Sequence, residues 1–72
     1  MSGIKEATAI AGGQKRLAAL VGVSQQSVSL WVTRGFAPVS RVVEIENHTG
    51  VPRERLLSPK VLDTVIRDRG AL

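Results

Sequence analysis

The stretch QKRLAALVGVSQQSVSLW, residues 14–31, decides the fold, because it contains two short helical patterns that meet at a glycine. Residues 14–21 carry leucine and valine at helical spacing, and Gly22 then interrupts the pattern. Ser24 is a good N-cap for a second helix from about Gln25 to Arg34, since its hydroxyl can accept from an unpaired N–H of the first turn. The stretch therefore predicts two helices and leaves open what the polar second helix faces.

These two helices meet the requirements of a helix-turn-helix over residues 14–33. The motif needs two helices at about 90–120°, a short turn that often contains glycine, and a small residue where the helices approach each other. Ala18 is the small residue, and Gly22 lies in the turn. The residues expected to point inward are Leu17, Val21, Val23, Val28 and Trp31.

Glycine and proline divide the rest of the chain into further short helices. A first helix is predicted over residues 4–11, before the glycine pair at 12–13. Another is expected between Pro38 and Gly50, and a short turn of helix between Val51 and Leu57, with Pro52 at its first position. With 72 residues and no cysteine, we expect one compact all-α domain of five or six helices, held by aliphatic packing.

The tail, residues 59–72, is predicted to be helical, with Ser58 and Pro59 as the start signal. A strand is the competing interpretation, because residues 64–66 are all β-branched. On a helix, the tail would carry a narrow apolar stripe that either completes the core of the monomer or forms a contact between two copies. This stripe consists of Val61, Leu62, Val65 and Ile66.

The positive charge is concentrated in the first half of the chain. The formal net charge is +4; residues 1–41 hold five bases and the single acid Glu6, whereas residues 42–72 hold five of each. Such a surface attracts polyanions such as nucleic acid. No apolar run approaches the roughly 20 residues of a membrane span, and no signal-peptide pattern is present, so a cytoplasmic protein without a membrane contact is expected.

The outward face of the second helix is polar and uncharged, which suits reading of DNA bases. Glutamine can pair with the N6 and N7 groups of adenine, serine can bond base edges or phosphates, and leucine can meet a thymine methyl. The N-terminal residues of such a helix reach the base edges in the major groove. The expected base-reading residues are Gln25, Gln26, Ser29 and Leu30, although Leu30 alternatively packs on the loop around Phe36.

Residues that flank this face are expected to contact DNA phosphates and to set the register. The bases among them are Lys15, Arg16 and Arg34, and the hydroxyl residues are Ser24, Ser27 and Thr33. One helix-turn-helix reads only about a half-site, so we expect a homodimer on a palindromic operator in double-stranded DNA.

Nothing in the sequence indicates an enzyme, a metal site or a cofactor. His48 is the single histidine and lies near a helix C-terminus, where a cation is favourable. Glu44 and Glu46 stand two residues apart and so do not share a helix face. We expect Arg41 to pair with a nearby carboxylate or to cap its helix region, with a phosphate contact as the lesser alternative. No nucleophile, phosphate-loop or ligand cluster is recognisable.

The chain also resembles the Cro-like and YdaS-like DNA-binding families over residues 4–57. The resemblance rests on AIAGGQKRLAALVGVSQQSVSLWVTRG at residues 9–35, on Pro38, Arg41, Ile45 and Glu46, and on TGVPRERL at residues 49–56. It implies a lambda repressor-like helical domain that binds operator DNA as a dimer and serves as a phage Cro repressor or an antitoxin. It also implies a phosphate contact for Gln14, and the trio at 25–27 is similar to the recognition helix of some phage repressors. The tail after Ser58 departs from the YdaS-like pattern.

We therefore predict a transcriptional regulator that binds a specific DNA sequence, of the Cro type found in phages and prophages, which represses by occupying an operator. The alternative is a DNA-binding antitoxin or adaptor of a toxin–antitoxin system, whose main partner is a toxin protein that docks on the tail.

Overall fold

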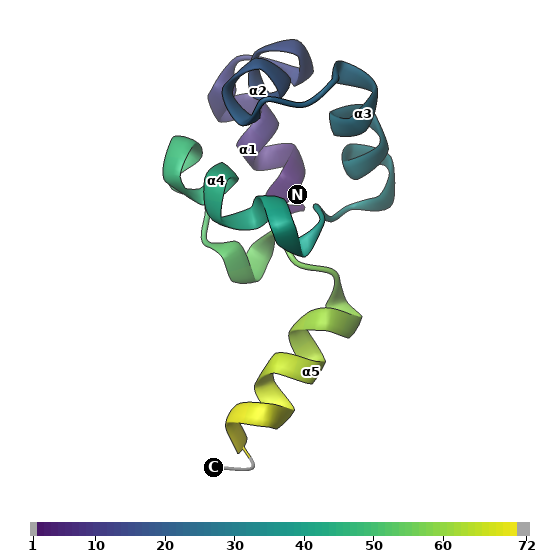
Figure 1. Cartoon of the computed structure of the whole chain (residues 1–72), viewed down its shortest axis with the longest axis vertical. Helices are drawn as coiled ribbons and strands as arrows, with labels where there is room; N and C mark the ends of the chain where they lie inside the picture. The colour runs from purple at the N-terminus through teal and green to yellow at the C-terminus, as the bar shows by residue number, and fades with distance from the viewer. Residues whose placement is uncertain (1, 71–72) are drawn as a thin grey trace.

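Short helices connected by tight turns make up the molecule. The structure is a computed structural model that describes residues 2–70, with side chains as far as Thr64. No strand occurs in this part of the chain, which confirms the predicted all-α class. Its elements are α1 (Gly3–Ala11), α2 (Gln14–Val21), α3 (Gln25–Arg34), α4 (Val39–Thr49), the 3-10 turn η1 (Arg53–Arg55) and α5 (Pro59–Gly70). The first four helices and η1 form a compact body, from which α5 extends (Figure 1).

Serine side chains cap the starts of three helices. The hydroxyl of Ser2 accepts from the N–H of Lys5 (3.3 Å) at the start of α1. Ser24 accepts in the same way at α3 (3.2 Å), and Ser58 does so at α5 (3.2 Å). Each cap satisfies one backbone donor that the helix leaves unpaired, which explains why these helices begin where they do.

Gly22 sets the turn between α2 and α3. Its φ of 79° and ψ of 34° are left-handed, and its N–H donates to the carbonyl of Ala18 (2.9 Å). A residue with a β-carbon would adopt this conformation at a cost of roughly 1–2 kcal/mol. Glycine therefore allows the chain to leave α2 and enter α3 within three residues.

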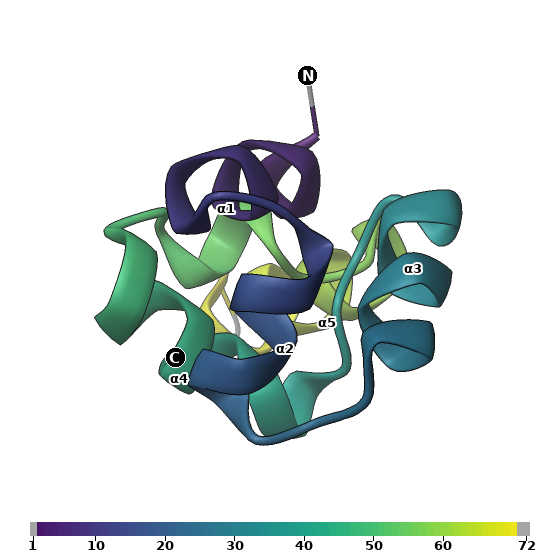
Figure 2. The same ribbon diagram turned by 90° about the horizontal axis from the view of Figure 1, so that it is seen from above.

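The core lies where α2 meets α1, α3 and α4 (Figure 2). Of the residues predicted to point inward, Val23 is half-buried against the core and the other four are buried, as is Ala18 at the helix crossing. The helix-turn-helix unit, α2 and α3, is therefore held by its contacts with α1 and α4. The buried core residues are Ile4, Ala7, Leu17, Ala18, Val21, Val28, Trp31, Ala37, Val42, Ile45, Val51 and Leu56.

The expected helix from Val51 to Leu57 is shorter than predicted. Pro52 precedes the first residue of η1, and η1 itself has only three residues. The chain must turn here because both Val51 and Leu56, on either side of η1, enter the core. The body is thus completed by a 3-10 turn.

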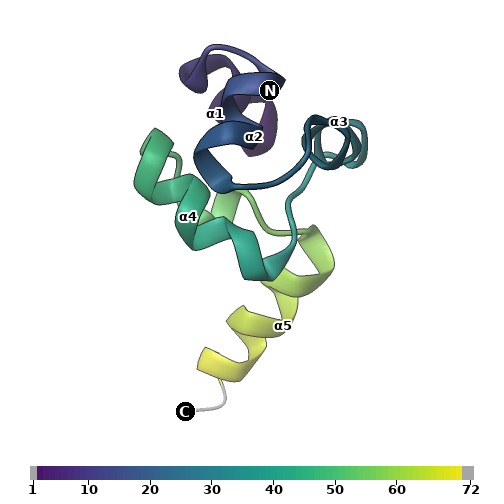
Figure 3. The ribbon, with the colours of Figure 1, turned by 45° about the horizontal axis from the view of Figure 1, so that its top comes forward.

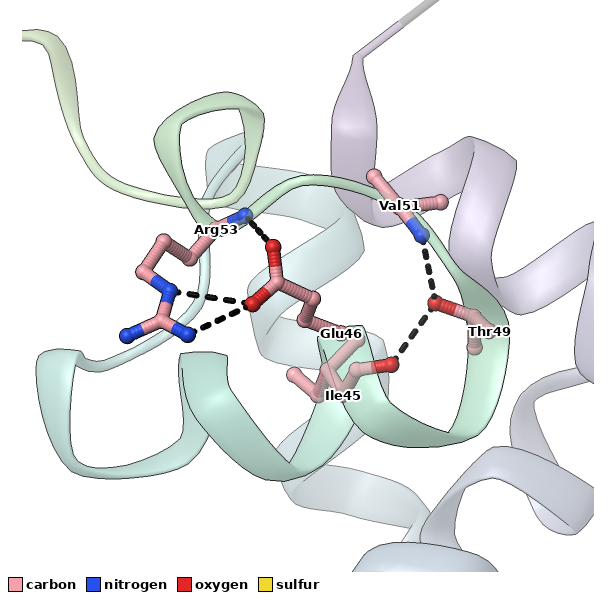
Figure 4. Close-up of polar contacts among 5 residues, drawn as sticks. All are labelled: Ile45, Glu46, Thr49, Val51 and Arg53. Carbon is pink, nitrogen blue, oxygen red and sulfur yellow. Dashed lines mark hydrogen bonds and ion pairs between the residues drawn. The ribbon is translucent and has the colours of Figure 1, made fainter.

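Polar contacts fix η1 to the end of α4 (Figure 4). The carboxylate of Glu46 accepts from the backbone N–H of Arg53 (2.9 Å) and from its guanidinium Nε and Nη2 (3.0 and 2.8 Å). Thr49 Oγ1 donates to the carbonyl of Ile45 (2.7 Å) and accepts from the N–H of Val51 (3.3 Å). These bonds hold the segment that carries Val51 and Leu56 into the core.

On its other side, η1 lies directly against the start of α1. Gly3 is buried, and a β-carbon there would lie 2.1 Å from the carbonyl oxygen of Arg55. The guanidinium of Arg55 also forms an ion pair with Glu6 of α1. Glycine at position 3 thus permits the close approach that joins the first helix to the last element of the body.

The Glu46–Arg53 contact predicts a loss of stability in acid. Hydrogen bonds from the backbone N–H and then the side chain of Arg53 hold the pKa of Glu46 below its ordinary value of 4.5. Because the folded-state pKa is depressed, the stabilisation is complete above the unfolded-state value and is lost as the pH falls through the folded-state value. We expect the free energies of unfolding of the wild type and of Glu46→Gln, measured with urea, to differ most above about pH 6.

Below pH 4.5, this difference between the two proteins should narrow. Other carboxylates titrate in both proteins, so the difference isolates Glu46. A difference that stays constant from neutral to acid pH would contradict the assignment.

Candidate nucleic-acid interface

The outward face of α3 is open to solvent. Val28 and Trp31 turn inward, which leaves the polar side chains of the helix on the other side. Leu30 lies among them with 52% of its surface exposed, so about half of this side chain is open to a ligand. The exposed residues of this face are Gln25, Gln26, Ser29, Leu30, Thr33 and Arg34.

Three glutamines and a serine surround a hollow of about 350 Å³ at the start of α3. Gln14, the first residue of α2, lines it together with Gln25, Gln26 and Ser29. Within the described part of the chain, none of the three carboxamides has a hydrogen-bond partner. Each therefore keeps its full set of donors and acceptors for a ligand. We call this site the glutamine hollow.

The predicted hydroxyl groups differ in how free they are. Ser24 Oγ accepts from the N–H of Ser27 (3.2 Å) and lies 3.0 Å from the Ser27 hydroxyl. Thr33 Oγ1 donates to the carbonyl of Ser29 (3.0 Å), whereas the Ser29 hydroxyl itself has no such bond in the described chain. A serine hydroxyl has one donor and two acceptor positions, so Ser24 and Ser27 retain some capacity.

None of the three predicted phosphate-binding bases lines the glutamine hollow. Lys15 and Arg34 are exposed, one on α2 and the other in the last turn of α3, and neither has a carboxylate partner among the described residues. Arg16 instead lines another hollow, together with Ala11, Ala19 and Leu20. Its side chain passes close to Gly12, with Cδ 3.0 Å from where a β-carbon of that glycine would be.

Other candidate residues occupy ordinary positions. Arg41 pairs with Glu44 (3.3 Å), and His48 is exposed in the last turn of α4, where a cation is favoured. Among the described residues, no three potential metal ligands gather into a site. None of the helices described here is long and apolar enough to cross a membrane.

Two crossed helices, a left-handed glycine between them and an exposed polar second helix define this chain as a helix-turn-helix protein. Residues 4–59 match the family described as bacterial toxin YdaS, and the chain belongs to that family.

Two relatives connect the chain with phages and with Cro. The Gene 30 protein of Enterobacteria phage phi80 is 42% identical over 53 residues, which make up 72% of this chain and 73% of that protein. The solution structure of XPH1, a hybrid sequence of the two Cro proteins Xfaso 1 and Pfl 6, which have different folds, is 38% identical with a TM-score of 0.61. That match covers 69% of this chain and 77% of XPH1. Together these findings show a phage Cro-like helix-turn-helix family.

Proposed function

We propose that the protein is a DNA-binding regulator that reads a specific operator by placing α3 in the major groove. The observation that carries this proposal is the glutamine hollow, where three carboxamides without internal partners gather at the exposed start of α3. A carboxamide can donate to N7 and accept from N6 of adenine at once, which makes it a selective reader of a base. The phage relative and the Cro-derived structural neighbour support the same function.

Within this proposal, the residues of the helix-turn-helix divide into two roles. Gln25 and Gln26, at the N-terminus of α3, read bases, with Ser29 and Leu30 extending the contact along the groove. The phosphate contacts position the helix and carry no sequence information. They come from Gln14, Lys15, Arg16, Ser24, Ser27, Thr33 and Arg34.

The operator is proposed to be a palindrome bound by a homodimer. One α3 covers about a half-site, and two copies on one face of the duplex give adequate affinity and specificity. Val61 and Leu62 are half-buried on α5, which extends from the body, and we assign the contact between copies to this helix. Val65 and Ile66, the other members of the predicted stripe, lie outside the described side chains. Occupation of the operator would exclude polymerase and repress transcription.

Selection of bound duplexes from a random pool at one fixed salt concentration tests the proposal. We expect a palindrome whose half-sites are centred about 10 base pairs apart or a multiple of this, with A·T pairs where the glutamines reach. Recovery of sequences without a common element would refute direct reading of bases. A single, unrepeated half-site would refute the homodimer and leave base reading intact.

A second candidate function rests on the description of the matched family as a bacterial toxin. In this case the chain acts within a toxin–antitoxin pair and its main partner is a protein. The two functions make opposite predictions for the double variant Gln25→Ala, Gln26→Ala. A regulator loses activity in an operator-controlled reporter, whereas a protein that acts through a protein partner retains its effect on growth of the host.

A further inference from the structure

A second hollow lies between the end of α1 and the outer side of α2. It has a volume of about 400 Å³ and is lined by Ala11, Arg16, Ala19 and Leu20. Leu20 is 46% exposed, and Ile10, next to Ala11 in the chain, is 54% exposed. Two large aliphatic side chains, one on α1 and one on α2, are thus exposed near this hollow. We call this site the α1–α2 hollow.

The α1–α2 hollow is separate from the glutamine hollow. No residue of α3 lines it, and α3 lies to one side of α1 and α2 in Figure 3. Arg16 is the one lining residue that is also a proposed phosphate contact, and none of the proposed base-reading residues lines the hollow.

Its charge indicates the chemistry of the occupant. Arg16 stands at the edge of the hollow and has no carboxylate partner among the described residues, and Lys15 precedes it. Glu6, the one acid of the first 41 residues, is already paired with Arg55. At this hollow, the chain itself offers Arg16 no carboxylate, and a bound protein with carboxylates would complement it.

The shape of the site favours a protein segment over a small molecule. Its volume falls within the range of ligand pockets, roughly 300–1,000 Å³, but only four side chains from two consecutive helices line it. Exposed aliphatic side chains on a helical surface are the usual receptor for the apolar face of another helix. A second copy is a poor occupant, because it would bring a second Arg16 into the interface and no free carboxylate from the same surface.

We propose that the α1–α2 hollow docks an acidic amphipathic helix of a different protein. Leu20 and Ala19 pack against the leucines of that helix, and Arg16 pairs with its carboxylates. Ala19 and Leu20 take no part in the proposed DNA contacts, so a change at Leu20 separates docking from DNA binding. Arg16 is shared with the proposed phosphate contacts, so a bound partner and DNA compete for its guanidinium.

A synthetic amphipathic peptide provides the test. Its length is about 15 residues, enough for a helix to form, with leucines at helical spacing and glutamates elsewhere. We expect its addition to the full chain to shift the methyl resonances of Ala19 and Leu20. The Leu20→Ser variant should bind the peptide about tenfold more weakly, the usual effect of truncating one central apolar anchor. A peptide with lysines in place of the glutamates should not bind.

Val39→Ser is the matched control, because Val39 is an aliphatic residue of α4 with 58% of its surface exposed. This variant should bind the peptide like the wild type, and Leu20→Ser should bind DNA like the wild type. The proposal is overturned if the acidic peptide does not bind, if it shifts α3 instead, or if Leu20→Ser binds it normally. Self-association that Leu20→Ser abolishes would assign the hollow to a second copy and overturn the proposed occupant.

Discussion

Replacement of Trp31 by alanine is expected to lower the free energy of unfolding by about 3–5 kcal/mol, the usual cost of removing a large aromatic side chain from a core. Trp31 lies on α3 with 7% of its surface exposed and belongs to the core that joins the helices. A domain of 72 residues has a total stability of only about 4–10 kcal/mol. The variant should therefore be close to unfolding, and DNA binding should be lost together with the fold.

Urea unfolding followed by far-ultraviolet circular dichroism measures this change, since the variant lacks the single tryptophan of the chain. The matched control is Leu30→Ala, at the preceding position of the same helix. Leu30 is 52% exposed, so its truncation should change stability by less than about 1 kcal/mol. Equal losses in the two variants would contradict the described orientation of α3, in which one residue faces the core and its neighbour faces solvent.

The orientation of α3 could be predicted because it depends on local sequence. The helix-turn-helix pattern placed Val28 and Trp31 on one side, and both are buried. Serine caps and left-handed glycines mark where helices begin and end, and both are recognisable from residues within one or two turns. The fold class followed from these local features together with the absence of cysteine.

Contacts between distant residues could not be predicted in this way. Glu46 and Arg53 are seven residues apart, and nothing in their spacing indicates that one carboxylate accepts both the backbone and the side-chain N–H groups of the other residue. The packing of Gly3 on Arg55 joins opposite ends of the body, so only the folded chain shows why glycine is needed there.

The exposed face of α3 could be predicted from the sequence, but the positions of neighbouring residues on α2 could not. Gln25, Gln26 and Ser29 were assigned to one exposed face, and the structure places them around a common hollow, although their contact with DNA remains a prediction. Arg16 was grouped with the phosphate contacts because of its charge. Its place beside Leu20, away from that hollow, depends on how α1 packs on α2, which the local sequence does not specify.

The variants Gln25→Ala and Gln26→Ala should each lose about 1–3 kcal/mol of discrimination between the selected operator and a base-substituted one, roughly 5- to 150-fold in relative affinity. Each carboxamide is exposed at the start of α3 and has no partner within the described chain, so its removal leaves the fold intact and deletes only what it offers to DNA. The measurement is a binding titration on both duplexes, repeated over a range of salt concentrations.

Salt dependence separates base reading from phosphate binding. Lys15→Ala and Arg34→Ala should weaken binding to both duplexes alike and reduce the slope of log affinity against log salt by about one unit. The glutamine variants should leave that slope unchanged, because a neutral amide releases no counterion. If they instead weakened both duplexes equally, the glutamines would be positioning groups and another part of α3 would read the bases. If they changed neither affinity nor discrimination, α3 would not be the reading helix, and a protein partner would become the better account of this chain.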